Sequence, residues 1–90
     1  MPEVRLPTVL RKNAGGQASV HVNGSTVGEV FVDLVRQFPL LAGQVVNEDG
    51  TMHKFVNVYR NDEDVRYLEK LDTKVSADDV ISVLPAVAGG

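Results

Sequence analysis

The stretch TVGEVFVDLVRQFP, residues 26–39, predicts one amphipathic helix. Thr26 followed three residues later by Glu29 matches a capping box, in which two side chains satisfy backbone N–H groups of the first turn. Apolar residues then recur on a single helical face, and Pro39 ends the segment because it has no N–H to donate. The expected apolar face consists of Val27, Val30, Phe31, Leu34, Val35 and Phe38.

Two strand patterns precede this helix. Residues 4–10 alternate between the two faces of a strand, and residues 18–22 alternate again. A turn-like segment at residues 12–16 separates them, so we expect an antiparallel hairpin with a loop longer than two residues. Pro7 lacks a backbone donor, so the first strand must place it where no hydrogen bond is needed, or contain a bulge.

Further strand patterns follow the helix. Residues 55–59 predict a third strand, residues 65–67 at most a short fourth strand, and residues 80–87 the last strand. Residues 61–64 are expected to form a turn. Residues 39–54 have a weaker pattern and are expected to be an irregular connection that contains a short helical turn.

This order predicts an α+β fold, with a mixed sheet of four to five strands and one main helix packed on one face. Ninety residues suffice for one domain, so we expect residues 1–86 to be that domain and residues 87–90 a flexible tail. The order resembles the β-grasp, or ubiquitin-like, fold. That resemblance implies that the last strand lies beside the first and that the tail projects from the sheet.

Composition excludes several classes of function. A net charge of −3 with only one basic pair, Arg11-Lys12, argues against a nucleic-acid partner. The chain has no cysteine, so it has no thiolate nucleophile, no disulfide and no sulfur ligand for a metal. Glu3 and Arg5 interrupt any apolar signal core, and no run is long enough to span a membrane. We expect a cytoplasmic protein.

The sequence ends in small residues directly after an apolar run. Glycine has no Cβ, so a Gly-Gly end is a narrow peptide that adopts whatever backbone angles an active-site channel demands. Four extended residues span roughly 13 to 14 Å, enough to enter such a channel while the folded body docks outside. We therefore expect a tail that threads into partner sites, with the carboxylate of the last residue as its reacting group: Val87, Ala88, Gly89 and Gly90.

Several blocks of the chain carry a family resemblance. The triplet DDV at residues 78–80 leads into the final apolar strand, and PAVAGG at residues 85–90 ends the chain. Through them the chain resembles, nearly end to end, the MoaD/ThiS family of sulfur carrier proteins. The blocks at residues 6–11, 55–59 and 61–66 resemble the CysO type within that family.

The resemblance implies a carrier that is not itself an enzyme and has no catalytic residue. In the family, an ATP-dependent adenylating enzyme activates the terminal glycine, here Gly90, and a sulfur donor converts it to a thiocarboxylate. The CysO type implies two more partners for cysteine biosynthesis: a pyridoxal-phosphate (PLP) dependent O-phosphoserine cysteine synthase, and a zinc-dependent peptidase that releases the cysteine. ATP, PLP and zinc belong to those partners, and this chain is expected to bind no cofactor.

Three alternatives remain open from the sequence. One alternative is the small subunit of molybdopterin synthase, an enzyme component that uses the same thiocarboxylate. An activated Gly90 also suits a ubiquitin-like modifier that becomes joined to lysines of other proteins. The simplest alternative is an interaction module whose tail has no role.

A partner surface is expected on the sheet face opposite the helix, where apolar side chains would remain accessible. We nominate Phe55, Tyr59 and Leu84 for it.

Other candidate sites are weak. His21 and His53 lack metal-ligand spacing, and the carboxylates of residues 61–64 lack the spaced ligands of a calcium loop. Gly15-Gly16 is not followed by the rest of a phosphate-binding motif, so a turn is expected there. No metal site is predicted.

Overall fold

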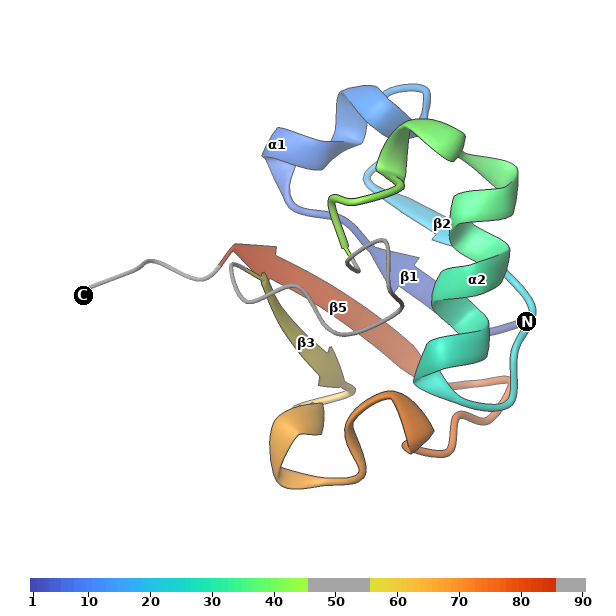
Figure 1. Cartoon of the computed structure of the whole chain (residues 1–90), viewed down its shortest axis with the longest axis vertical. Helices are drawn as coiled ribbons and strands as arrows, with labels where there is room; N and C mark the ends of the chain where they lie inside the picture. Colours follow the sequence, from blue (N-terminus) through green and yellow to red (C-terminus); the bar gives the residue numbers. More distant parts are fainter. Residues whose placement is uncertain (46–55, 86–90) are drawn as a thin grey trace.

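A computed structural model describes residues 1–45 and 56–85 of the chain. Five strands form one sheet in the order β2-β1-β5-β3-β4, and the helix α2 lies across one of its faces (Figure 1). The strands are β1 (Glu3–Arg5), β2 (Ser19–His21), β3 (Val56–Arg60), β4 (Glu63–Asp64) and β5 (Val80–Pro85). The helices are α1 (Thr8–Arg11) and α2 (Val27–Gln37), with 3-10 turns η1 (Lys12–Ala14), η2 (Pro39–Leu41), η3 (Val65–Tyr67) and η4 (Lys70–Asp72).

The sheet is mixed, and its middle strand is the last one in the chain. β1 pairs antiparallel with β2 and parallel with β5, while β5 pairs antiparallel with β3. The register places Val4 opposite both Val20 and Ile81. The predicted α+β architecture, a β-grasp sheet with the last strand beside the first and one main helix on one face, is confirmed.

The main helix begins and ends where the sequence predicts. Thr26 is its N-cap, and the Oγ1 of Thr26 accepts a hydrogen bond from the backbone N–H of Glu29 at 3.1 Å. The Glu29 side chain accepts in return from the N–H of Ser25 at 2.9 Å, one residue earlier than in the usual capping box. Phe38 is the C-cap, and Pro39 starts the turn η2, which confirms the short helical turn predicted after the helix.

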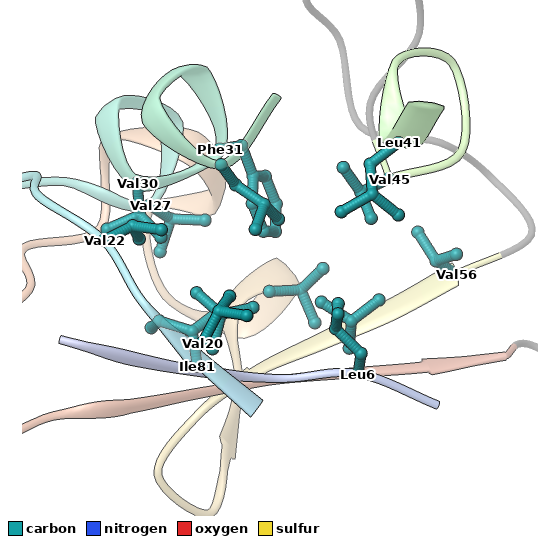
Figure 2. Packing of buried hydrophobic residues seen from close by; sticks show 14 of the residues in the cluster. Leu6, Val20, Val22, Val27, Val30, Phe31, Leu41, Val45, Val56 and Ile81 are labelled. Carbon is teal, nitrogen blue, oxygen red and sulfur yellow. The ribbon is translucent and has the colours of Figure 1, made fainter. Parts of the chain in front are cut away.

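The apolar face of α2 packs against the buried side of the sheet (Figure 2). Phe31 and Leu34 are among the largest fully buried side chains, while Val35 and Phe38 are partly buried and pack at the margin of the core. Alternate residues of the strands complete the core from the other side. Those fully buried side chains of the sheet include Val4, Val58, Ile81 and Val83.

The strand predicted at residues 4–10 is wrong beyond Arg5. Pro7 precedes the helical turn α1, and its backbone carbonyl accepts a hydrogen bond from the N–H of Leu10 at 2.9 Å. Pro7 has no backbone N–H to donate to a neighbouring strand, so the chain leaves the sheet there and forms a helical turn. This turn places the side chain of Leu10 in the core. The hairpin itself, β1 with β2, is confirmed, and its long connection holds α1 and η1.

The short fourth strand predicted at residues 65–67 is also wrong. That segment is the 3-10 turn η3, capped by Asp64, whose Oδ1 accepts from the backbone N–H of Arg66 at 2.9 Å. The fourth strand is β4, which overlaps the turn predicted at residues 61–64. Local capping by Asp64 therefore prevails over the strand propensity of the residues after it.

Two predicted boundaries reach past the described residues. The third strand is described over Val56–Arg60, which ends one residue later than the predicted 55–59, and Phe55 lies outside the described part. The last strand is described through Pro85. The tail Val87-Ala88-Gly89-Gly90, and the boundary between the domain at residues 1–86 and that tail, also lie outside it.

The sequence pattern did not indicate that one carboxylate of the helix is buried. Asp33, on α2, is only 6% exposed. Its Oδ2 accepts from the backbone N–H of Asn23 and from the Gln37 side chain, both at 2.8 Å, and its Oδ1 pairs with Arg36. The Asn23 N–H and then the Arg36 guanidinium lower the pKa of Asp33 below its usual value. Asp33 therefore ties the loop after β2 to the helix.

Replacing Asp33 with asparagine should make the protein less stable at neutral pH and remove part of its acid sensitivity. The pKa of Asp33 is depressed in the fold, so its stabilising effect is present above the ordinary value of 3.8 and is lost as the pH falls through the depressed value. Thermal melts of both proteins at pH 7 and in acid would show the difference in melting temperature narrowing in acid. A difference that stays constant with pH would contradict this role.

Candidate functional site

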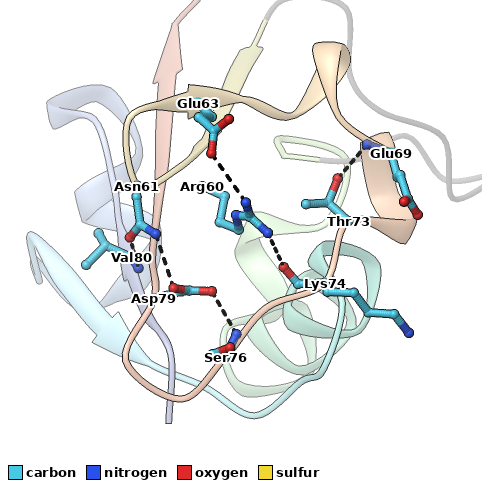
Figure 3. A network of polar contacts seen from close by, with 9 residues as sticks. All are labelled: Arg60, Asn61, Glu63, Glu69, Thr73, Lys74, Ser76, Asp79 and Val80. Atoms are coloured by element: carbon cyan, nitrogen blue, oxygen red, sulfur yellow. Dashed lines mark hydrogen bonds and ion pairs between the residues drawn. The ribbon is translucent and has the colours of Figure 1, made fainter.

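The start of β5 is fixed by a network of polar contacts with the end of β3 (Figure 3). Asn61 donates its backbone N–H to the Val80 carbonyl at 2.7 Å, and its side-chain oxygen accepts from the Val80 N–H at 3.0 Å. Its side-chain amide donates to Asp79 at 3.1 Å. Asn61 has a φ of 56°, in the left-handed region that asparagine tolerates better than most residues. This geometry sets where the last strand begins.

Two more contacts hold the segment that leads into β5. Asp79 accepts from the backbone N–H of Ser76 at 2.8 Å, and this bond, followed by the one from Asn61, lowers the pKa of Asp79. Arg60 donates to the Lys74 carbonyl at 3.0 Å and pairs with Glu63. The segment that leads into β5 is therefore held by Arg60 and Asn61 at the end of β3 and by its own turn at Ser76–Asp79.

Burial in β5 ends shortly before the tail. Ile81 and Val83 are buried, whereas Leu84 is 46% exposed and Pro85 is also exposed. The strand thus leaves the core after Val83. Since β5 lies between β1 and β3, its position in the sheet is constrained from both sides.

Two of the three nominated surface residues lie on the sheet face opposite α2. Leu84 stands opposite Asn57 in the register, and Tyr59 stands opposite Ser82. These residues alternate with the buried ones of the same strands, so their side chains share the open face. Leu84 is exposed and Tyr59 half-buried; Phe55, the third nominee, is outside the described part.

An arginine is held at the edge of this open face. Arg66 donates to the side-chain oxygen of Asn57 and pairs with Asp64 at 3.1 Å. The Arg66 guanidinium lowers the pKa of Asp64, and Asp64 raises the pKa of Arg66. Asp64 forms an ion pair with Arg66 and so offsets much of its positive charge. The main effect of Arg66 is therefore to hold η3 against β3.

An open groove of about 580 Å³ lies between α1 and the end of β5. Sequence reasoning missed this groove because it took residues 8–10 for a strand. The only available signal was Pro7, which favours a helix start as well as a strand edge. Its lining residues are Arg5, Leu6, Pro7, Thr8, Val9, Arg11, Ser82, Val83, Leu84 and Pro85.

The weaker candidates occupy ordinary positions. His21 lies exposed on β2, and His53 is outside the described residues. Gly15 and Gly16 have φ of 69° and 83° and form the turn that the sequence predicts. Within residues 1–45 and 56–85, no three His, Asp or Glu side chains gather as a metal site. In the same two ranges, no helix has both the length and the apolar character to cross a membrane.

Sequence comparison identifies relatives over almost the whole chain. The ThiS family matches residues 4–90. The chain is 43% identical over 89 residues to the sulfur carrier protein CysO of Mycobacterium tuberculosis, covering 97% of this chain and 96% of the relative. It is 37% identical to the small archaeal modifier protein 3 of Haloferax volcanii, covering 83% and 84% of the two chains.

Structural comparison agrees with the sequence relatives. A chain of the BexX/CysO complex of Amycolatopsis orientalis superposes with a TM-score of 0.90 at 41% identity, with all of both chains covered. The CysO structure of Mycobacterium tuberculosis also gives a TM-score of 0.90, at 39% identity, over 97% of this chain and 100% of that one. The likeness therefore includes the strand order and the helix position described above.

Proposed function

The chain belongs to the ThiS family and is a sulfur carrier protein, and we propose that Gly90 carries the sulfur as a thiocarboxylate for cysteine biosynthesis. The observation that carries this proposal is the 43% identity to CysO over 97% of the chain. Within the fold, β5 is anchored at its start and leaves the core after Val83. A last strand that is fixed at its start and leaves the core near its end supports a role in which the folded domain presents a narrow tail to a partner.

The first step is activation of the terminal carboxylate by a partner enzyme. A glycine carboxylate is an anion at neutral pH and therefore a poor electrophile. An ATP-dependent adenylating enzyme joins it to AMP and releases pyrophosphate. A sulfur donor, formally hydrogen sulfide, then attacks the carbonyl carbon, and AMP leaves with the bonding electrons. The product is a thiocarboxylate on Gly90.

The second step transfers the sulfur to an amino-acid precursor. In a PLP-dependent O-phosphoserine cysteine synthase, phosphate is eliminated first, and the thiocarboxylate sulfur then forms the new carbon–sulfur bond at the carbon that carried the phosphate. A shift of the acyl group from sulfur to nitrogen leaves cysteine joined to Gly90 by an amide. A zinc-dependent peptidase hydrolyses that amide and restores the carboxylate. The chain itself contributes the tail and the docking body, and its partners contribute the catalysts.

The mass of the intact protein, isolated under native conditions from its own cells, tests this proposal. We expect a fraction whose mass exceeds that of the plain chain by the exchange of one oxygen for sulfur, mapped to Gly90. A further fraction with one added cysteine is the signature of the cysteine route. A terminus that stays unmodified under high sulfur demand would refute the proposal.

A protein modifier is the second candidate, because the chain is 37% identical to a small archaeal modifier protein. The same activated Gly90 then reacts with a lysine amine, and the product is an isopeptide bond. Tryptic peptides of other proteins that carry the Gly90 remnant on lysine would favour this function. Stable co-purification with a large catalytic subunit would instead favour a role in molybdopterin synthase.

A further inference from the structure

We propose that Asn23, which Gly24 follows in the loop between β2 and α2, is a site of spontaneous modification at which the folded chain loses ammonia and gains an aspartate or an isoaspartate. The isoaspartate form has a longer backbone in this loop, and we expect it to loosen the start of α2. The residues involved belong to the body of the chain, so the site is independent of the function proposed for Gly90.

The reaction needs only water. The backbone nitrogen of Gly24 loses its proton and attacks Cγ of Asn23, and the side-chain amide nitrogen leaves as ammonia. The product is a five-membered cyclic imide. Water then opens the ring at one of its two carbonyl carbons. Cleavage of the new Cγ–N bond gives aspartate, whereas cleavage of the original backbone C–N bond gives isoaspartate, in which the backbone runs through the side chain. Either product adds one negative charge.

The local structure leaves the attacking nitrogen available. Glycine has no Cβ, so the backbone nitrogen of Gly24 is not crowded by a side chain. Among residues 1–45 and 56–85, no backbone oxygen accepts a hydrogen bond from the Gly24 N–H, so the reaction has no such bond to break there. Asn23 is exposed, and water therefore reaches its side-chain amide.

The packing of α2 requires this glycine. A Cβ at position 24 would lie 2.6 Å from the backbone nitrogen of Val30 and 2.8 Å from its Cγ2, closer than packed atoms can stand. Val22, Val27 and Val30 gather at this end of the helix (Figure 2). A larger residue in place of Gly24 would push the helix away from the loop. The reactive pair is therefore a consequence of how the fold closes on itself.

The other described asparagines are less reactive. Asn61 is bound through both its side-chain oxygen and its side-chain amide, and Asn57 accepts through its side-chain oxygen and precedes the β-branched Val58. Asn13 lies within η1. In the described part of the chain, the hydrogen bond that Asn23 donates uses its backbone N–H instead, so its side chain can turn toward the next residue.

The loop that would be lengthened is short and held at both ends. Residues 23–25 join the fully buried Val22 to Thr26, the N-cap of α2. Within them, Asn23 donates its N–H to Asp33 at 2.8 Å. Isoaspartate inserts one more carbon into the backbone, about 1.5 Å of extra path. Its new carboxylate also lies on the residue that Asp33 contacts, and like charges repel. We expect the contact with Asp33 to be lost.

Incubation of the folded chain in warm, mildly alkaline buffer, followed by peptide mapping, tests the site. We expect residue 23 to exchange its side-chain NH₂ for OH and to give separate aspartate and isoaspartate peptides. Fragmentation of the peptides assigns the position. The reaction at Asn23 should be at least about tenfold faster than at Asn57, because a β-branched side chain crowds the attacking nitrogen of Val58 and no side chain crowds that of Gly24.

Asn23→Gln is the matched control. Glutamine keeps the backbone N–H that binds Asp33, but its attack requires a larger ring, so the modification at position 23 should disappear. Isoaspartate is counted by enzymatic methylation of its carboxylate with labelled S-adenosylmethionine. The control retains the pair Asp49-Gly50, which also can form isoaspartate. The difference between the two proteins therefore measures position 23 alone.

Asn23→Asp separates the new charge from the longer backbone. The isoaspartate form, purified by chromatography, should melt at a lower temperature than the freshly prepared Asn23→Asp protein, which has the same charge. Amide hydrogen exchange in the first turn of α2 should be about tenfold faster in the isoaspartate form, because local opening there no longer breaks the contact with Asp33.

Three results would overturn the proposal. If residue 23 stays intact in the folded chain while the chain unfolded in urea is modified there, the fold protects the pair. If the Asn23→Gln protein gains as much isoaspartate as the native chain, the reaction occurs elsewhere. If the isoaspartate form matches Asn23→Asp in melting temperature and in amide exchange, the loop accommodates the extra carbon and the start of α2 is not loosened.

Discussion

Deleting Gly90 should abolish thiocarboxylate formation and leave the melting temperature of the protein unchanged. Deletion moves the reacting carboxylate back by one residue, roughly 3.3 to 3.6 Å, out of register with a catalytic site that attacks it. Gly89→Val should have the same effect, because a β-branched side chain widens the tail and restricts its backbone. In the described part of the chain, the last buried residue is Val83, so we expect no core contact to be lost.

The measurement pairs chemistry with stability. Each variant is incubated with the adenylating enzyme, ATP and sulfide, and the intact mass reports conversion. Thermal melts of the same samples report the fold. A clear fall in melting temperature for either variant would mean that the tail is part of the structure. Conversion of the shortened chain at the native rate would mean that the terminal glycine is not the reacting group.

Phe31→Ala should have the reverse effect, with a loss of about 3 to 5 kcal/mol in the free energy of unfolding. Phe31 is 1% exposed and packs from α2 onto the sheet, so truncation leaves a cavity that the surrounding side chains cannot fill. A small domain has a total stability of about 5 to 15 kcal/mol. The variant should therefore unfold at a much lower temperature or denaturant concentration.

A residue of the same helix provides the control. Val32 is 71% exposed on the outer side of α2, and Val32→Ala should change the free energy of unfolding by less than about 0.5 kcal/mol. Urea titrations of the three proteins give the comparison. Below its unfolding transition, the Phe31→Ala protein should still accept sulfur on Gly90. Equal losses for the two variants would mean that the outer side of the helix is also covered.

The parts of the fold that depend on local pattern could be predicted from the sequence. The cap at Thr26, the stop at Pro39 and the apolar spacing between them define α2 without reference to any other segment. The alternation of Ile81 and Val83 with exposed positions likewise identifies β5. The spacing of apolar residues predicts such elements because the burial of each residue depends mainly on its position within its own helix or strand.

The features that were missed depend on contacts between distant residues. The alternation of apolar residues places Leu10 on the inner face of a strand. In the structure, Leu10 reaches the core from the helical turn α1, which follows Pro7. Asp33 looks like a solvent-facing helix residue because its main partner, the Asn23 N–H, lies ten residues away. The groove needs both α1 and the end of β5, so no local pattern indicates it. The role of the tail stays a prediction that rests on the sequence and the family alone.

The central place of β5 also has a consequence for biosynthesis. A ribosome delivers the chain from its N-terminus, so β1 and β3 emerge before the strand that must lie between them. The nascent polypeptide therefore cannot close its sheet until residues 80–85 have been translated and released. Premature termination before that point yields a polypeptide without its central strand, which is open to proteolysis.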